Sequence, residues 1–252
     1  MADRAPRQAA ERDSDPLGGA SSAPPDREEV RRAGPLLIVG FLVLLGCALL
    51  LAVLATDVRR QELTELDRFG NPFMHALASP LLDAVMNAAS FVGTDVVLLG
   101  IAAVVVLVLV RARRDREAVF LGVVLIGSIL LNLGMKLFFH RARPSLPWAT
   151  VIPDYSFPSG HAMNSLAFGL AVALIVWRLF GPRWGTASLV LAFLGAGLIG
   201  LSRIYLGYHY VTDVIGGYAT AALWVGIVVA VFRAVAPAPR DPDQLRTRLS
   251  PR

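Results

Sequence analysis

Cysteine, lysine and charge are all scarce in this chain of 252 residues. The one cysteine, Cys47, lies inside an apolar run, which leaves neither a disulfide framework nor a cysteine-based metal site. Charged residues make up 17% of the chain and hydrophobic residues 55%. A soluble domain of this length needs more charge to cover its surface, so the composition indicates a membrane protein.

The net charge of +5 comes almost entirely from arginine, because Lys136 is the single lysine. A nucleic-acid binder would show a basic stripe on a soluble domain. The sequence has no such stripe, so we expect no nucleic-acid partner. Arginine-rich loops on one side of a membrane account for the charge better.

Six apolar runs are interpreted as membrane spans, for which about 20 residues suffice. They cover residues 35–55, 95–110, 118–139, 162–180, 184–202 and 211–232. Residues 57–92 mix charged, turn and amphipathic stretches, which predicts one or two helices lying in the interface. The expected fold class is all-α: a bundle of six membrane helices with an interfacial amphipathic segment between the first two spans.

Residues 1–32 and 236–252 are rich in proline and charged residues without an apolar period, which predicts two disordered tails around a membrane domain at 33–235. If both tails are cytoplasmic, eleven basic residues lie in the inner segments: Arg27, Arg31, Arg32, Arg111, Arg113, Arg114, Arg116, Arg178, Arg183, Arg233 and Arg240. Seven lie in the outer ones: Arg59, Arg60, Arg68, Lys136, Arg141, Arg143 and Arg203. The excess inside favours this orientation, in the plasma membrane.

Pro158-Ser159-Gly160-His161 stands where a polar loop meets an apolar run. Ser159 is predicted to cap a helix whose first turn contains Gly160 and His161. A helix start is an anion site, because its N–H groups are unpaired and its dipole is positive there. The histidine adds a group that exchanges protons near neutral pH. Alone, the string also fits an ordinary capped helix with an interfacial histidine.

A second cluster contains Lys136 and Arg143, seven residues apart. They are expected to share one helix face until Pro144 ends the helix. Two cations snorkelling from a helix end would explain this pair equally well.

A third cluster runs from Ser202-Arg203 to His209 and Asp213. His209 is expected to open the last helix, with Asp213 four residues later on the same face and within reach of the imidazole. A carboxylate inside a membrane span is costly and usually has a partner and a function.

Together, the clusters supply what phosphoryl transfer requires, and the expected topology places all three on the outer side. Lys136, Arg143 and Arg203 can neutralise the oxygens of a phosphoryl group. The backbone N–H groups at Ser159 and Gly160 add donors. No carboxylate cluster stands beside them to hold magnesium, so we expect neither a metal ion nor another cofactor.

The two histidines can divide the proton and phosphorus chemistry. His209, oriented by Asp213, can attack phosphorus in line. His161 can protonate the leaving alcohol and then activate the hydrolytic water.

The spacing resembles the three-part signature of the type 2 phosphatidic acid phosphatase superfamily, in its membrane branch. The matching segments are residues 136–144 (Lys, six residues, Arg-Pro), 158–161 (Pro-Ser-Gly-His) and 202–213 (Ser-Arg, five residues, His, three residues, Asp). The resemblance covers nearly all of the chain except the tails.

This resemblance implies that His209 is a nucleophile forming a phosphohistidine, with Asp213 its partner and His161 the general acid and base. It implies that phosphate is bound by Lys136, Arg143, Ser159, Gly160 and Arg203. His140 and Arg141 have no role in the signature and are expected to be solvated loop residues.

The favoured hypothesis is metal-independent hydrolysis of a lipid phosphate monoester or diphosphate at the outer face, with the lipid and the bilayer as partners. Phosphatidic acid, phosphatidylglycerophosphate and polyprenyl diphosphate stay open as substrates, and the oligomeric state cannot be inferred. Vanadium haloperoxidases share the pattern, but they are soluble. A non-hydrolytic lipid phosphate binding or transport protein would need the cations but not the His209–Asp213 pair.

Overall fold

The computed structural model describes residues 27–60 and 62–235, with side chains from residue 38 onward. Over this part the chain is helical and has no strand. The helices are α1 (Arg27–Arg59), α2 (Glu65–His75), α3 (Pro80–Val92), α4 (Asp95–Arg111), α5 (Asp115–Phe139), α6 (Gly160–Phe180), α7 (Pro182–Tyr205) and α8 (Val211–Ala234). The chain divides into two units, residues 1–41 and 42–252, and the three clusters predicted from the sequence lie in the second.

Local sequence signals explain where these helices begin. Thr64, Ser79 and Thr94 precede α2, α3 and α4, and each side-chain oxygen accepts the backbone N–H three residues further on. Gly181, with φ of 87°, and Pro182 separate α6 from α7.

Two predicted boundaries need correction. α1 begins at Arg27, so the last six residues of the tail predicted at 1–32 are helical. α8 begins at Val211, so His209 precedes the last helix instead of opening it. The rest of the first tail and the tail at 236–252 lie outside the described residues.

The number of membrane spans depends on whether helices α3 and α4 together count as one span. α4 has 17 residues, about 25 Å at 1.5 Å per residue, against a hydrocarbon core of about 30 Å. It qualifies as a span only together with α3, from which it is bent by 56°. Within the described part, five helices can span a membrane, or six if this bent pair counts as one span. The all-α membrane fold is confirmed, although α3, expected in the interface, belongs to the pair.

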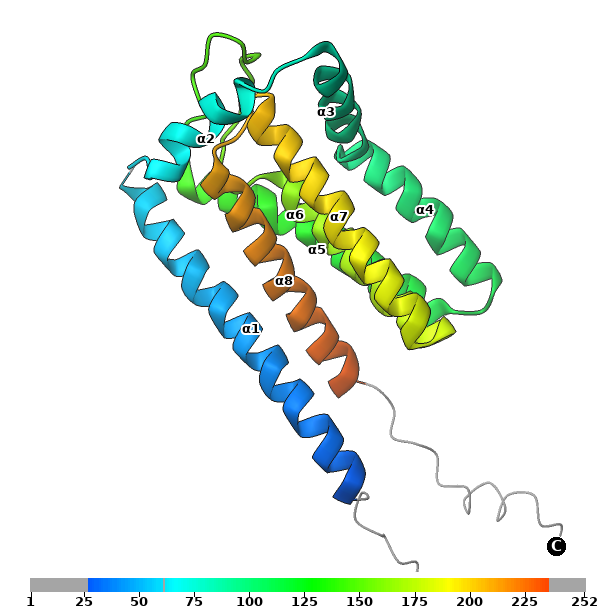
Figure 1. The fold of residues 1–252 in the computed structure, drawn as a ribbon. Coiled ribbons are helices and arrows are strands. Elements are labelled where there is room, and N and C mark those ends of the chain that lie inside the picture. Colours follow the sequence, from blue (N-terminus) through cyan, green and yellow to red (C-terminus); the bar gives the residue numbers. More distant parts are fainter. Residues whose placement is uncertain (1–26, 61, 236–252) are drawn as a thin grey trace, which may run out of the picture. The chain divides into compact units, whose positions relative to one another are not determined.

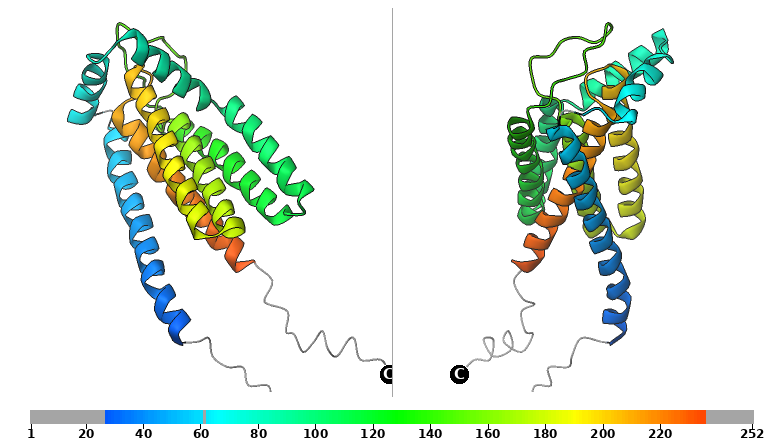
Figure 2. Two further views of the ribbon diagram at one scale, coloured as in Figure 1. Left: turned by 45° about the vertical axis from the view of Figure 1, so that its right-hand side comes forward. Right: turned by 90° about the vertical axis from the view of Figure 1, so that its left-hand side faces the viewer.

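Helix α6 is the centre of the bundle in the second unit. It packs against α4, α5, α7 and α8 (Figures 1 and 2). Small residues allow this close packing: Ala162, Ala167 and Ala171 are fully buried, and a Cβ on Gly169 would lie 2.8 Å from that of Ala192. Helix α6 is therefore packed closely against its neighbours from its first turn, at Ala162, to its middle, at Ala171.

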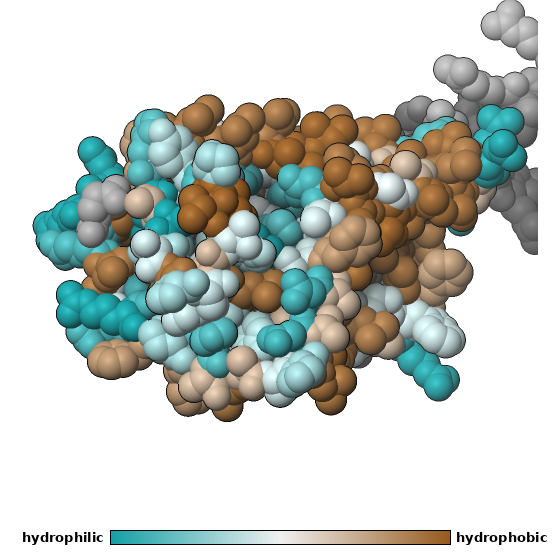
Figure 3. All heavy atoms as spheres, turned by 90° about the horizontal axis from the view of Figure 1, so that it is seen from above, coloured by the Kyte–Doolittle hydropathy of each residue, from teal (hydrophilic) through white to brown (hydrophobic). Residues whose placement is uncertain are grey.

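One end of the bundle carries α2, α3 and the loop of residues 140–159, where α5 ends and α6 and α8 begin (Figure 1). Hydrophilic residues gather over much of this end, with hydrophobic residues along its edges (Figure 3). His75 of α2 stacks on Trp148 of the loop, with ring centroids 4.1 Å apart. This stacking connects the predicted interfacial segment to the loop.

Gly217 offers a test of the packing between α6 and α8. A Cβ there would lie 2.8 Å from the carbonyl oxygen of Ser159, and backbone cannot rotate away. We expect Gly217→Ala to destabilise the protein by about 1–3 kcal/mol, seen as a lower apparent melting temperature in detergent. Gly197→Ala is the control, because nothing lies within 4 Å of its added Cβ. Equal melting temperatures for the two variants would contradict this packing.

Candidate active site

The three clusters predicted from the sequence meet at the hydrophilic end of the bundle. Arg143 of the first cluster places Nη1 3.1 Å from Nε2 of His209 in the third. The backbone N–H of Ser159, in the second, donates to the carbonyl oxygen of Asp213 in the third at 3.0 Å. Each of these contacts joins residues more than 50 positions apart in the chain, and together they bring the three clusters into one site.

The first cluster reaches the site differently from the prediction. α5 ends at Phe139 because His140 adopts a left-handed conformation, with φ of 49°, so Lys136 and Arg143 do not share a helix face. Arg143 lies in the loop, where Nη1 donates to the carbonyl of Tyr208 at 2.6 Å. This contact turns the guanidinium towards His209.

His209 is 1% exposed and lies just outside α8, so the predicted shared helix face with Asp213 is wrong. The two side chains still meet, with Nδ1 3.4 Å from the Oδ2 of Asp213. Because an arginine can only donate, the Nε2 facing Arg143 carries the lone pair and Nδ1 carries the proton. Nε2 is therefore the nitrogen that can act as a nucleophile.

Burial lowers the pKa of His209 to about 4. The carboxylate of Asp213 opposes this shift, whereas Arg143 and Arg203 add to it. With that pKa the imidazole is neutral at pH 7, and its lone pair needs no base to release it.

Asp213 is fully buried and held by partners on every side. Its carboxylate accepts hydrogen bonds from the hydroxyl of Ser156, from the backbone N–H of Tyr210 at 2.9 Å, and from Arg141 Nη1 at 2.6 Å. The orientation of the carboxylate is therefore fixed within the protein.

Arg141 contradicts the expectation of a solvated loop residue. It is 3% exposed, and its Nη2 donates to Asp67 Oδ2 at 2.8 Å while Nη1 binds Asp213. Burial works against its charge, but Asp213 and Asp67 outweigh burial and raise the pKa of Arg141 above its usual value. The arginine is thus the shared cation of two buried carboxylates.

Helix α2 supplies two residues that the sequence patterns did not single out. Asp67 accepts the backbone N–H of Thr212 at 3.0 Å, at the start of α8. Asn71 donates to the carbonyls of Ile204 and His209 at 2.8 and 3.0 Å. Their spacing of four residues on an amphipathic helix is the signal that could have identified them.

The second cluster begins α6 as predicted, with Ser159 at the N-cap position. Its hydroxyl makes no cap hydrogen bond, and the loop is held instead by Asn132, whose amide donates to the carbonyl of Pro158 at 3.1 Å. His161 lies against the joint of α3 and α4, since a Cβ on Gly93 would be 3.2 Å from its Cδ2.

Arg203 of the third cluster is 5% exposed. It donates to the hydroxyl of Ser90 and lies over the ring of Tyr208, 4.3 Å from its centroid. Its Nε has no hydrogen-bond partner.

Unpartnered polar atoms concentrate at this end of the molecule. Across the described residues, the buried side-chain nitrogen and oxygen atoms without a hydrogen-bond partner are Asn71 Oδ1, Trp148 Nε1, Ser159 Oγ, Arg203 Nε and His209 Nδ1. Three of them belong to predicted site residues. Buried polar atoms usually have partners, so this concentration is what a site built for a polar ligand shows.

No metal-binding cluster occurs in the part of the chain that the structure describes: no three His, Cys, Asp or Glu are placed to share an ion. The one carboxylate among the predicted site residues, Asp213, pairs with Arg141 and His209, and the other predicted site residues offer cations, a histidine and backbone N–H groups. A phosphoryl group suits that set of donors.

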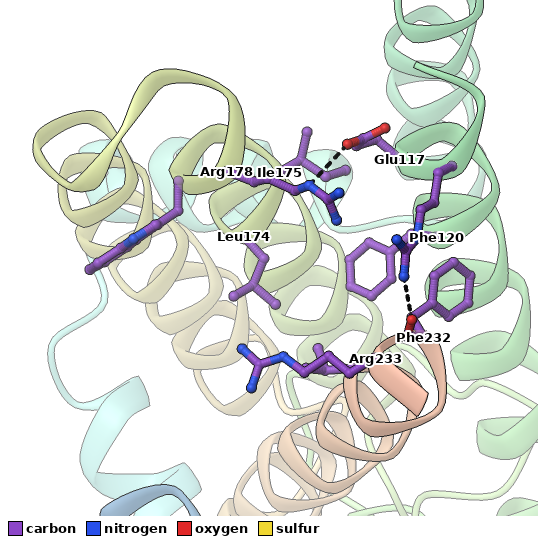
Figure 4. A pocket seen from close by; sticks show the side chains of 10 residues that line it. Glu117, Phe120, Leu174, Ile175, Arg178, Phe232 and Arg233 are labelled. Atoms are coloured by element: carbon purple, nitrogen blue, oxygen red, sulfur yellow. Dashed lines mark hydrogen bonds and ion pairs between the residues drawn. The ribbon is translucent and has the colours of Figure 1, made fainter. Parts of the chain in front are cut away.

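A separate cavity of about 360 Å³ lies at the opposite ends of α5, α6 and α8 (Figure 4). Arginines and apolar side chains line it, with Glu117 paired to Arg178 at 3.3 Å. It contains none of the predicted site residues, so it is not the candidate active site.

Parts of the chain are similar to known proteins. A family model described as the PAP2 superfamily matches residues 117–236, a range that contains all three clusters. Over these residues the chain is similar to the PAP2 superfamily. The resemblance and the enzyme class predicted from the sequence, a lipid phosphate phosphatase, are both confirmed.

Two curated relatives come from Bacillus subtilis. Phosphatidylglycerophosphatase B is 27% identical over 173 residues, covering 68% of this chain and 85% of the relative. Undecaprenyl-diphosphatase BcrC is 28% identical over 144 residues, covering 50% and 70%. Among solved structures, a transmembrane PAP2-type phosphatidylglycerolphosphate phosphatase from the same species has a TM-score of 0.70 at 25% identity, covering 78% of this chain and 98% of that one.

Removing the Arg141 guanidinium tests whether this cation stabilises the two buried carboxylates. Arg141→Met leaves Asp67 and Asp213 buried without their cation, which we expect to cost about 3–5 kcal/mol of stability. Arg68→Met is the control, because Arg68 is 60% exposed and its pair with Glu65 contributes at most about 0.5 kcal/mol. Apparent melting temperatures in detergent measure both, and a drop for Arg141→Met no larger than the control's contradicts the assignment.

The ionisation of His209 can be followed directly. Below its pKa of about 4 the imidazole gains a proton and loses the lone pair, so it stays neutral from pH 5 upward. NMR titration of histidine side-chain carbons, assigned with His209→Asn, should show a midpoint near 4. A midpoint near the ordinary value of about 6.5 would show that burial does not control this group.

Proposed function

We propose that this protein hydrolyses a lipid phosphate monoester or diphosphate without a metal ion, through a phosphohistidine on His209. The observation that carries the proposal is the contact of Arg143 with Nε2 of a buried His209 that has Asp213 at its other nitrogen. This arrangement directs a neutral nucleophile towards a phosphate-binding cation.

In this proposal, phosphate is bound by the cations of the site and by the start of α6. Lys136, Arg143 and Arg203 neutralise the non-bridging oxygens, and guanidinium groups bind oxygen pairs with good geometry. The backbone N–H groups at Ser159 and Gly160 add donors at the positive end of a helix. The unpartnered Ser159 Oγ and Arg203 Nε support this role, because a phosphoryl oxygen would supply the missing acceptor.

The reaction then takes two displacements at phosphorus. The lone pair of His209 Nε2 forms the P–N bond while the P–O bond to the lipid breaks, and His161 gives its proton to the leaving oxygen. His161 next takes a proton from water, whose oxygen forms a new P–O bond as the P–N bond breaks. Asp213 stabilises the positive charge that His209 carries in between.

The proposed substrate class is a phosphate on a membrane lipid. Relatives are named for phosphatidylglycerophosphate and undecaprenyl diphosphate, and both present a charged phosphate beside apolar tails. The distribution of arginines supports a site on the outer face of the plasma membrane with both termini in the cytoplasm. A lipid-binding or transport role lacks support, because binding alone has no use for the His209–Asp213 pair.

Phosphate release from a substrate panel tests the proposal. The purified protein is assayed in detergent with EDTA on phosphatidic acid, phosphatidylglycerophosphate and undecaprenyl diphosphate. We expect release from at least one of them, and a fall of about 10³-fold or more for His209→Asn, which keeps the side-chain size but removes the nucleophile. Full activity of a well-folded His209→Asn variant would overturn the mechanism.

A trapping experiment separates the roles of the two histidines. With ³²P-labelled p-nitrophenyl phosphate, whose leaving group needs no protonation, His161→Ala should still be labelled while hydrolysis of the label slows. The label should be stable in alkali and labile in acid, and absent from the double variant with His209→Asn. Equal label in the double variant would place the nucleophile elsewhere.

A further inference from the structure

Asp154, in the loop of residues 140–159, holds both cations of the first cluster. Its Oδ2 accepts from Lys136 Nζ and lies 3.2 Å from Arg143 Nη2. Its backbone carbonyl accepts from Arg143 Nε at 3.1 Å. The sequence patterns gave this aspartate no role.

The exposures of these three side chains differ. Lys136 and Arg143 are each 12% exposed, whereas Asp154 is 43% exposed. Burial opposes ionisation of Asp154, but the hydrogen bond and charge of Lys136 outweigh it, with further help from Tyr155 and Arg143, and hold the pKa of Asp154 below its usual value. The carboxylate is therefore an anion at neutral pH, and it is more exposed to solvent than the two cations that it contacts.

We infer that Asp154 is a specificity-determining residue: its carboxylate competes with the incoming phosphate for Lys136 and Arg143 and thereby excludes phosphodiester headgroups. The inference rests on the proposed function, since it takes these cations as the phosphate site. A carboxylate resembles one edge of a phosphate, with two oxygens sharing one negative charge.

Because Asp154 carries one negative charge, the charge of a ligand decides whether the ligand displaces this carboxylate from Lys136 and Arg143. A phosphodiester carries one negative charge, so exchanging Asp154 for a diester gains little electrostatic energy. A phosphate monoester carries a charge of about −1.5 to −2 at pH 7, and gains from the same cations. Because Asp154 is tethered, its effective concentration reaches the millimolar range, and a singly charged ligand has to exceed that as well.

This discrimination matters for an enzyme inside a bilayer, where phosphodiester headgroups surround the site. Without a resident anion, the paired cations would attract any of these headgroups. The structure also gives the aspartate room to leave. A cavity of about 230 Å³ adjoins Arg143 and Asp154 beneath the loop, bounded on its other side by Gly207 and Tyr208.

Ligand binding by Asp154→Asn tests the inference independently of catalysis. The probes are inorganic phosphate, which is partly a dianion at pH 7.5, and dimethyl phosphate, a diester monoanion, titrated calorimetrically into the detergent-solubilised protein. We expect Asp154→Asn to bind dimethyl phosphate at least about tenfold tighter than wild type does. Its affinity for phosphate should rise less, so that the ratio of the affinity for phosphate to that for dimethyl phosphate falls.

Two further variants control the result. Glu65→Gln removes a negative charge from α2 at the same end of the molecule, where Glu65 is 72% exposed and pairs with Arg68, and it should behave as wild type. Asp154→Glu keeps the charge and should keep the discrimination. If Asp154→Glu binds dimethyl phosphate as tightly as Asp154→Asn does, the negative charge at this position does not determine the preference for phosphate, and the inference is wrong.

The outcomes also separate this inference from the proposed function. In parallel, hydrolysis of the best substrate is measured with phosphatidylglycerol, a diester, added as inhibitor; it should inhibit Asp154→Asn at about tenfold lower mole fraction than wild type. Unchanged preference and inhibition in an active Asp154→Asn enzyme overturn the role of Asp154 and leave the phosphatase proposal intact. A narrowed preference in a protein that releases no phosphate supports Asp154 and contradicts the phosphatase proposal.

Discussion

The site depends on the neutralisation of two carboxylates buried beneath it. Asp213 and Asp67 have no exposed side-chain surface, and a single guanidinium, that of Arg141, contacts both. Desolvated charges persist only when opposite charges and hydrogen bonds compensate them. This requirement ties three segments together, because Asp67 comes from α2, Arg141 from the loop after α5, and Asp213 from α8.

The arginines of the site accordingly divide between two tasks. Arg141 donates to two buried carboxylates and to the hydroxyl of Thr212, so both of its Nη atoms have partners within the protein. Arg143, two residues later, faces His209, and its other partners among the described residues are an exposed carboxylate and two backbone carbonyls. Arginine suits both tasks, since its rigid fork binds two groups at once and it stays charged when buried.

The sequence predicted the membrane bundle, the three clusters and the start of α6, because these depend on local periodicity, capping and spacing. The sequence patterns did not predict the features described next. His140 ends α5 in a left-handed conformation, which no local signal before Pro144 indicated. The role of Arg141 depends on Asp67, 74 residues away, and docking of α2 depends on backbone carbonyls that side-chain patterns cannot report. His209 and Asp213 meet although they do not share a helix, because the turn at Gly207, with φ of 74°, returns the chain to α8.

Helix α2 has two faces with different surroundings. Asp67 and Asn71 hold the start of α8 and the backbone carbonyl of His209, while Leu66, Phe69 and Phe73 are 58–67% exposed. Lipids or detergents that contact these exposed side chains therefore contact the same helix that donates a hydrogen bond to the backbone of His209. For this protein, the choice of amphiphile therefore concerns the surroundings of the candidate site as well as solubility.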